Sequence, residues 1–178
     1  MLGLQPTPLS SGRPAVNRGI VRNNIIFTSG GWDAIASALT IDVQIYNNTI
    51  VKGYDPHDID RGIRDVSGKD YPSKGLIVIN NFANSYQLNG NTTIITENNL
   101  LKTDYDVKDY FVNAPPSHLD ELQLMDYYYS HNVKPEDFML TEKAAKALSK
   151  GKALPTLVDE DFFGNARGTK PDIGAIQR

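Results

Sequence analysis

The chain has 178 residues, of which 40% are hydrophobic and 22% charged, so it is long enough for one domain with a sizeable core and is not wholly disordered. Its net charge of −3 excludes the basic surface that nucleic-acid binding needs, and the lack of cysteine excludes disulfides, thiolate metal sites and a cysteine nucleophile. No run approaches the ~20 apolar residues of a membrane span, so we expect no membrane insertion.

Residues 1–15 are rich in Pro, Ser and Gly, and we expect them to form an irregular N-terminal segment. They do not look like a signal peptide, because Pro, Ser and Arg interrupt any apolar run.

Adjacent asparagines mark a repeat in residues 16–101. Asn occurs fifteen times, and chance would produce about one adjacent pair. The chain has four such pairs: Asn23-Asn24, Asn47-Asn48, Asn80-Asn81 and Asn98-Asn99. Each pair lies between two short apolar or β-branched segments, which are typical of strands. The sequence therefore predicts a repeated strand, Asn-Asn, strand unit.

The spacing of these pairs, 24, then 33, then 18 residues, favours a mainly β fold in which parallel strands wind into a β-helix, or solenoid. The shortest interval is too small for a strand–helix–strand crossover, whereas a coiled sheet accommodates extra residues as loops at its turns. An ordinary β-sandwich with four unrelated turns is the alternative. In the solenoid, asparagines one strand apart, ~4.7 Å, can hydrogen-bond into a ladder; the structural candidates are Asn24, Asn48, Asn81 and Asn99.

The longest interval places the loop Lys52–Lys74 between two coils, and loops on rigid scaffolds often carry function. A polysaccharide lyase must neutralise a uronate carboxylate and remove the neighbouring proton. Arg61 or Arg64 can serve the first task. For the second, the candidates are Lys74, Tyr54 and His57.

The same loop contains three acidic residues, Asp55, Asp58 and Asp60, which could bind calcium. They do not follow the spacing of an EF-hand loop, and solvated turn carboxylates are the competing interpretation. Apart from this calcium, no cofactor is predicted. Trp32 and Tyr71 are candidate substrate-binding aromatics, and a core position for Trp32 is the competing and slightly favoured interpretation.

Residues 102–178 are expected to cover and close the same domain. Residues 102–116 are interpreted as a linker, and a helix is expected from an N-cap at Ser117 to His131, with Leu119, Leu122 and Met125 facing the protein. Tyr127, Tyr128 and Tyr129 could form a sugar-stacking platform, although consecutive helical residues point in different directions. A second short helix is expected over Thr141–Leu148, with Thr141 as its cap and Gly151 as its stop.

Two segments, Val21–Ile26 and Ile45–Val51, resemble coils of the right-handed parallel β-helix repeat superfamily, which includes pectate-lyase-like and other exported bacterial proteins. The closing segment resembles the "D-x-G-x-x-R … D-I-G-A" ending of exported β-helix proteins, over Asp159–Arg167 and Lys170–Ile176. Upstream, residues 135–140 and 144–151 occupy the place of that group's "DF-x-L … SPAI-x-x-G" stretch, but Lys-Ala-Leu replaces Pro-Ala-Ile.

The resemblance implies a short right-handed parallel β-helix with one or two peripheral helices near the C-terminus. Within the closing motif, Asp161, Arg167 and Asp172 are expected to form a structural ion-pair and turn network, with Gly164 at the bend. A glycosidase pair formed by Asp159 and Asp161 is the weaker alternative, because both belong to this motif.

The resemblance also implies a secreted or cell-surface location and a polysaccharide partner. The expected function is that of the C-terminal part of an exported carbohydrate-active β-helix protein, more plausibly a lyase than a glycoside hydrolase, acting on an acidic polysaccharide. A non-catalytic carbohydrate-binding or structural surface module is the alternative, so whether the chain is an enzyme stays open. Four coils make a stack of only about 15 Å, so we expect further N-terminal coils or a partner over the first coil.

Overall fold

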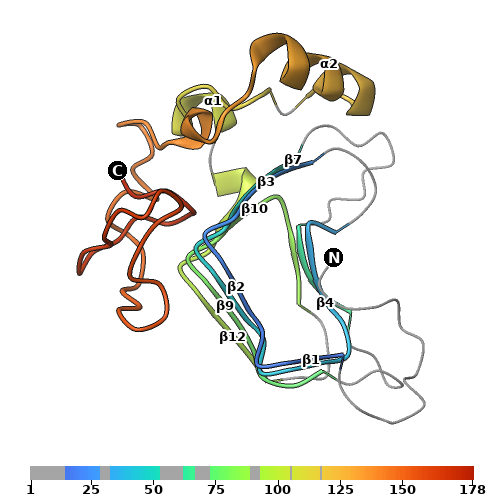
Figure 1. Cartoon of the computed structure of the whole chain (residues 1–178), viewed down its shortest axis with the longest axis vertical. Helices are drawn as coiled ribbons and strands as arrows, with labels where there is room; N and C mark the ends of the chain where they lie inside the picture. The colour runs from blue at the N-terminus through green and yellow to red at the C-terminus, as the bar shows by residue number, and fades with distance from the viewer. Residues whose placement is uncertain are drawn as a thin grey trace.

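A computed structural model describes residues 15–28, 33–52, 62–66, 73–88, 93–104, 106–116 and 118–178. It is mainly β, with parallel strands in stacked sheets and two short α-helices (Figure 1). Trp32 and Tyr71, and the loop residues Tyr54, Asp55, His57, Asp58, Asp60 and Arg61, lie outside the described residues.

Four parallel sheets make up the body of the molecule, and we number them I to IV. Sheet I contains β2 (Ile20–Arg22), β6 (Gln44–Tyr46), β9 (Leu76–Ile79) and β12 (Ile94–Glu97). Sheet II contains β3 (Ile25–Thr28), β7 (Thr49–Lys52), β10 (Phe82–Ala83) and β13 (Leu100–Leu101). Sheet III contains β4 (Ile35–Ser37), β8 (Ile63–Asp65) and β11 (Tyr86–Gln87), and sheet IV contains β1 (Val16–Asn17) and β5 (Thr40–Ile41).

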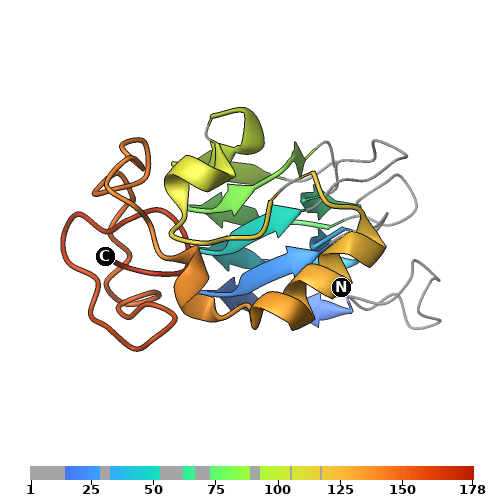
Figure 2. The same ribbon diagram turned by 90° about the horizontal axis from the view of Figure 1, so that it is seen from above.

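The chain passes through sheets I, II and III in turn and then returns to sheet I, one strand further along the stack; in the described residues sheet IV receives a strand only before β2 and before β6. Each circuit is called a coil here: the described residues within 16–28, 35–52, 63–83 and 86–101 form the first to fourth. Equivalent residues of successive coils stack in register; Ile45, for example, pairs with Val21 on one side and Val78 on the other. The arrangement is consistent with a β-helix-like solenoid, and Figure 2 shows the stacked strands from the side.

The interior of the coils is apolar because alternate residues of each strand point inward. Its buried residues come from sheets I, II and III and include Ile45, Ile50, Ile63, Leu76 and Val78. A second apolar cluster lies on the other face of sheet II, where Val51, Phe82 and Leu100 contact the later part of the chain. Sheet II is therefore buried on both faces.

Residues 102–116, predicted to be a linker, instead fold onto this outer face of sheet II. They contain a 3-10 helix over Lys102–Asp104 and α1 over Val107–Tyr110, and Phe111 packs against Phe82 with ring centroids 5.3 Å apart. Val107, Tyr110 and Phe111 are apolar or aromatic and are buried against the sheet. The segment therefore covers sheet II and is not a solvent-exposed linker.

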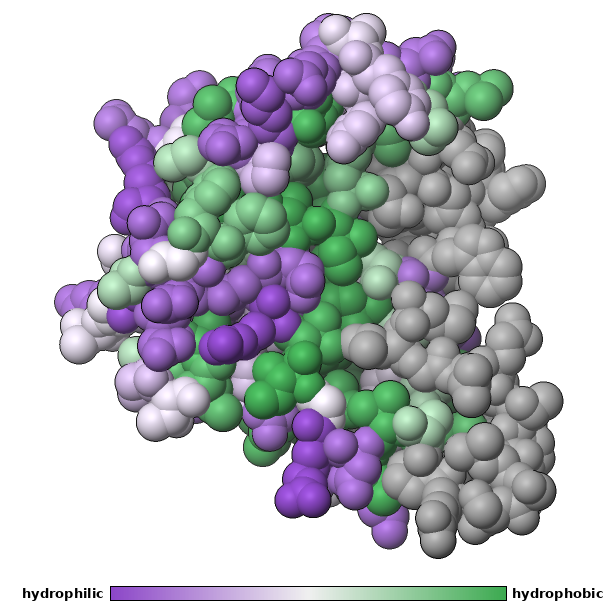
Figure 3. All heavy atoms as spheres, in the orientation of Figure 1, coloured by the Kyte–Doolittle hydropathy of each residue, from purple (hydrophilic) through white to green (hydrophobic). Residues whose placement is uncertain are grey.

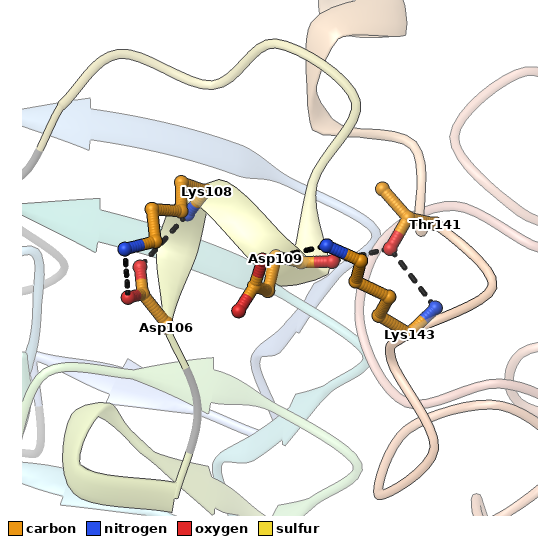
Figure 4. A network of polar contacts seen from close by, with 5 residues as sticks. All are labelled: Asp106, Lys108, Asp109, Thr141 and Lys143. Atoms are coloured by element: carbon orange, nitrogen blue, oxygen red, sulfur yellow. Dashed lines mark hydrogen bonds and ion pairs between the residues drawn. The ribbon is translucent and has the colours of Figure 1, made fainter.

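Polar contacts hold α1 in place (Figure 4). Asp106 caps the helix by accepting a hydrogen bond from Lys108 N (3.1 Å), and the two side chains also form an ion pair. Lys143 Nζ lies 3.0 Å from Asp109 Oδ1, and the Thr141 hydroxyl donates to the Asp109 carbonyl. These contacts connect α1 to the segment that follows the second helix.

The second helix, α2, spans Glu121–His131 and lies over the outer side of sheet II (Figure 1). Its N-cap is Asp120, which forms a capping box with Gln123, so the prediction that the helix starts at Ser117 was wrong. The expected inward face was also wrong: Leu122 and Met125 are 78% and 52% exposed, whereas Leu124 is 5% exposed.

The helix expected over Thr141–Leu148 is a series of turns followed by Ser149 in the left-handed region. Thr141 does cap the amide of Lys143 (3.2 Å). A 3-10 helix over Pro135–Phe138 precedes it and places Phe138 against Phe27 and Phe111. From residue 149 onward the chain lies beside the corner between sheets I and II (Figure 1).

In the part of the chain that the structure describes, no helix has both the length and the apolar character needed to cross a membrane.

Candidate functional site

The corner between sheets I and II carries all four asparagine pairs. The second member of each pair joins one coil to the next: both Asn24 N and Asn24 Nδ2 donate to Asn48 Oδ1 (3.0 and 2.9 Å). The same contacts run from Asn48 to Asn81 and from Asn81 to Asn99. These side chains form an asparagine ladder along the stack, which we call the inner column.

The first member of each pair has a left-handed backbone and forms a different set of contacts. The φ angles of Asn23, Asn47, Asn80 and Asn98 lie between 49° and 61°, a region that Asn enters at lower cost than most residues. Asn80 Nδ2 donates to Lys152 O (2.8 Å) and Asn80 Oδ1 accepts from Lys152 N (2.8 Å). Asn23 Nδ2 donates to Glu160 O (2.7 Å). This outer column therefore holds the closing segment, residues 149–178.

Arg167 is the centre of that attachment. Its Nη2 donates to Asn23 Oδ1, Gly174 O and Ala175 O, at 3.2, 2.8 and 2.9 Å. Nε and Nη1 donate to the carbonyls of Glu160 and Asp172. Burial lowers the pKa of Arg167 to about 10, opposed by the negative charges of Asp161 and Asp172, so the side chain is cationic at neutral pH.

Asp161, Arg167 and Asp172, which were expected to form ion pairs and turns, take part in a network of hydrogen bonds to the backbone. Within residues 149–178, Arg167 binds carbonyl oxygens, while the two carboxylates bind backbone amides. Asp161 accepts from the amides of Phe163, Asn165 and Gln177, and Asp172 accepts from those of Ser149 and Arg178. Gly164 has a φ of +82° and supplies the bend.

These amide contacts set the ionisation of Asp161. Burial by itself raises the pKa of this carboxyl, but hydrogen bonds from Gln177, Asn165 and Phe163 outweigh burial and hold its pKa below 3.8. A carboxylate used in this way has no lone pairs directed at a substrate. The asparagine corner is therefore a structural joint between the coils and the closing segment.

A candidate substrate-contacting residue lies on sheet III instead: Arg64, in strand β8. Ile35 and Ile63 of this sheet point into the coil interior, so Arg64, next to Ile63, points to the outer face. Its Nη1 lies 3.5 Å from Asp33 Oδ2, and the Arg64 side chain is 34% exposed. The Asp33 side chain is only 6% exposed, and its Oδ1 has no hydrogen-bond partner in the described part of the chain.

Asp33 was missed by the sequence analysis, because nothing in the sequence around a single Asp connects it to an arginine 31 positions later. The parallel pairing of β4 with β8 places these two segments side by side. The resulting pair is a cation anchored by a buried carboxylate, with about a third of the Arg64 side chain open to solvent.

Lys74, the other predicted catalytic residue that the structure describes, lies elsewhere. It is exposed and bridges Ile41 at the end of sheet IV, where its amide donates to Thr40 O and its carbonyl accepts from Asp42 N. The structure thus places Arg64 and Lys74 on different sheets. The candidate metal ligands Asp55, Asp58 and Asp60 lie outside the described residues, and within those residues no three acidic, His or Cys side chains are grouped to hold a metal ion.

The aromatic residues of α2 do not form one stacking surface. Tyr127 stacks on His131 of the next turn, with centroids 3.9 Å apart and ring planes 7° apart. Tyr128 and Tyr129 lie edge to face and are both exposed. Because the three rings point in different directions, they do not present a continuous platform to a sugar chain.

A hollow of about 570 Å³ opens at the fourth coil. Its walls include Tyr86, Leu88, Ile94, Thr96 and Asn99. The hydroxyl of Tyr86 is held inside by the carbonyls of Asn81 (2.9 Å) and Leu100 (3.2 Å). This hollow lies at an end of the stack, away from the outer face of sheet III.

No protein-family model, curated protein or solved structure matches this chain at a significant level.

Proposed function

We propose that this chain is a right-handed parallel β-helix of the pectate-lyase-like kind, belonging to an exported bacterial carbohydrate-active protein, and that it binds an acidic polysaccharide. The stacked parallel sheets, the asparagine ladder and the resemblance of the closing motif to that group support the architecture. The binding function is carried by one observation, the anchored cation Arg64 on the outer face of sheet III.

The physical reason lies in the guanidinium group. Arg has five N–H donors in a planar fork, and among the described residues the contact with Asp33 involves only Nη1, so other donors can bind the carboxylate of a uronic acid. The buried Asp33 holds the side chain in place, so less rotamer entropy is lost when an anionic sugar binds. In this proposal Arg64 is therefore the residue that neutralises the uronate carboxylate, as the sequence analysis expected of Arg61 or Arg64.

In the lyase form of this proposal, Arg64 stabilises the charge that develops on the uronate when the neighbouring proton is removed. The base comes from the predicted set Tyr54, His57 and Lys74, with calcium at Asp55, Asp58 and Asp60 as a further expectation. The position of Lys74 on a different sheet from Arg64 favours the second candidate, a carbohydrate-binding module without catalysis.

Binding and catalysis are tested together with alginate, pectate and chondroitin. We expect calorimetry to detect binding of at least one of these polyanions, and Arg64→Ala to weaken it at least about tenfold, because one charge-assisted contact contributes roughly 1.5–3 kcal/mol. Arg64→Lys should recover part of the affinity, and Asp33→Asn should weaken binding by releasing Arg64. The matched control is Arg178→Ala, which removes another arginine held by an acidic residue, Glu142.

Ultraviolet absorbance of unsaturated products separates the two candidates. Product formation that Arg64→Ala abolishes supports the lyase. Binding without product supports the non-catalytic module. Absence of binding to all three polyanions, or equal binding by wild type and Arg64→Ala, contradicts the assignment of sheet III as the binding face.

A further inference from the structure

The two ends of the coil stack are complementary in their hydrogen-bonding groups. Along the inner column each asparagine donates from its backbone amide and Nδ2 to the Oδ1 of the next coil. Within the described residues, the column therefore ends with Asn24 Oδ1 unused as an acceptor at the first coil and the Asn99 backbone N–H unused as a donor at the fourth, where Asn99 Nδ2 donates to Val78 O (2.7 Å).

Burial along the column agrees with this direction. The central members, Asn48 and Asn81, are fully buried, whereas Asn24 is exposed and Asn99 is partly exposed. In the strand order of sheets I and II, β2 and β3 lie at one end and β12 and β13 at the other. A parallel strand laid on either end would extend both sheets.

Charge is complementary at a single register position of sheet I. Arg22, Tyr46, Ile79 and Glu97 stack above one another in the four coils. The first coil thus has a cation at the position where the fourth has an anion. Both side chains stay partly exposed, Arg22 near Asp159 and Glu97 near Lys152.

Apolar surface accompanies these polar groups at each end. Val16, Val21 and Ile26 of the first coil are half-buried members of the interior. Figure 3 looks along the stack from this end and shows hydrophobic surface at the centre of the view. At the other end, Leu88 and Ile94 line the hollow of the fourth coil.

We propose that the occupant of these ends is a second copy of this chain, whose first coil stacks on the fourth coil of its neighbour. In this arrangement the Asn99 backbone N–H donates to Asn24 Oδ1 of the next copy, Glu97 faces Arg22 of the next copy, and the interiors become continuous. The contact is head-to-tail, so a dimer still has an unoccupied first coil at one end and an unoccupied fourth coil at the other. Further copies can therefore add to form a filament, unless the rotation between neighbouring copies closes a ring.

Sedimentation velocity of the full chain over a range of concentrations tests this proposal. We expect species that grow beyond a dimer as concentration rises. Arg22→Glu or Glu97→Arg should each weaken association at least about tenfold, because like charges would face each other. The double variant, R22E with E97R, should restore it. Higher salt should weaken wild-type association.

Asp159→Ala and Lys152→Ala are the matched controls, since they remove the partners of Arg22 and Glu97 within the chain but leave the stacking charges in place. They should associate as wild type does, and far-ultraviolet circular dichroism should show that all variants are folded. A wild-type chain that stays monomeric at every concentration overturns the proposal. So does a dimer of limited size that Glu97→Arg leaves unchanged, because a contact that does not involve the fourth coil indicates first coil against first coil.

Discussion

The two members of each asparagine pair are adjacent in sequence and form different contacts. The inner column, Asn24, Asn48, Asn81 and Asn99, connects coil to coil through amide contacts that repeat at every step. In the outer column, Asn23, Asn47 and Asn80 donate to the backbone of the closing segment, and Asn80 Nδ2 also donates to Asn47 Oδ1 of the neighbouring coil (3.2 Å). The left-handed turn at the first asparagine is what points neighbouring side chains in opposite directions.

The difference shows how one dipeptide can make two kinds of connection, one between successive coils and one between the coils and the closing segment. Contacts of the inner column involve the same residue type on both sides, so they tolerate any loop length between coils as long as strands stay in register. Contacts of the outer column depend on one particular backbone path through residues 149–178. We therefore expect damage to the inner column to lower global stability and damage to the outer column to release the closing segment first.

Asn81→Ala should have the largest effect. The substitution leaves Asn48 Nδ2, Asn99 Oδ1 and the carbonyls of Ile45 and Ile79 without this partner in a buried site. At about 1–3 kcal/mol for each unsatisfied buried group, the free energy of unfolding should fall by on the order of 4 kcal/mol in urea denaturation. Asn80→Gly, which retains the left-handed turn next door, should cost less than half as much. Equal losses would remove the distinction between the columns.

Arg167→Lys should have the second largest effect. An ammonium group cannot reach the five acceptors that the guanidinium contacts, so we expect a loss of about 2 kcal/mol. Limited proteolysis should cut residues 149–178 sooner than in wild type, while the coils stay resistant. Arg178→Lys, at an exposed pair with Glu142, should change stability by less than about 0.5 kcal/mol. Cleavage that begins in the coils would contradict the expected order.

Asp161→Asn should have the smallest effect, on the order of 1 kcal/mol, because the turn that it organises is exposed and its amides can bind water instead. The effect should depend on pH. The folded-state pKa of Asp161 lies below 3.8, so its stabilisation is fully present above that value and is lost as pH falls through the lower folded pKa. Unfolding curves of wild type and variant should converge in acid, and a constant difference down to the lowest pH would contradict this account.

The repeat was predictable from sequence because its residue types have strong local preferences: Asn for the left-handed turn and β-branched residues for the strands. Four Asn pairs between β-branched segments indicated parallel strands in register, and the pairs stack as expected. The different contacts of the two asparagines in each pair were not predictable, since they depend on the direction in which each side chain points away from the turn.

Other features depended on tertiary contacts that a local pattern does not contain. Residues 102–116 have the polar composition of a linker, but Val107, Tyr110 and Phe111 find an apolar sheet face to cover. In α2 the buried residue is Leu124 rather than Leu122, because the helix start shifts to Asp120 and the packing surface selects one side. The Arg64–Asp33 pair joins two segments through β4 and β8, which no spacing rule could connect.

The close packing at Gly174 has a consequence for folding during synthesis. A side chain there would meet Phe82 Cδ2 and Thr49 Oγ1, each 2.8 Å from the Cβ position, so only glycine lets the chain lie this close to sheet II. The neighbours Ile173, Ala175 and Ile176 then complete the apolar cluster on that sheet. Ribosomes synthesise these residues after all four coils. A nascent chain therefore carries uncovered apolar surface on sheet II until its closing residues emerge, and in that interval it is most exposed to aggregation and most dependent on chaperones.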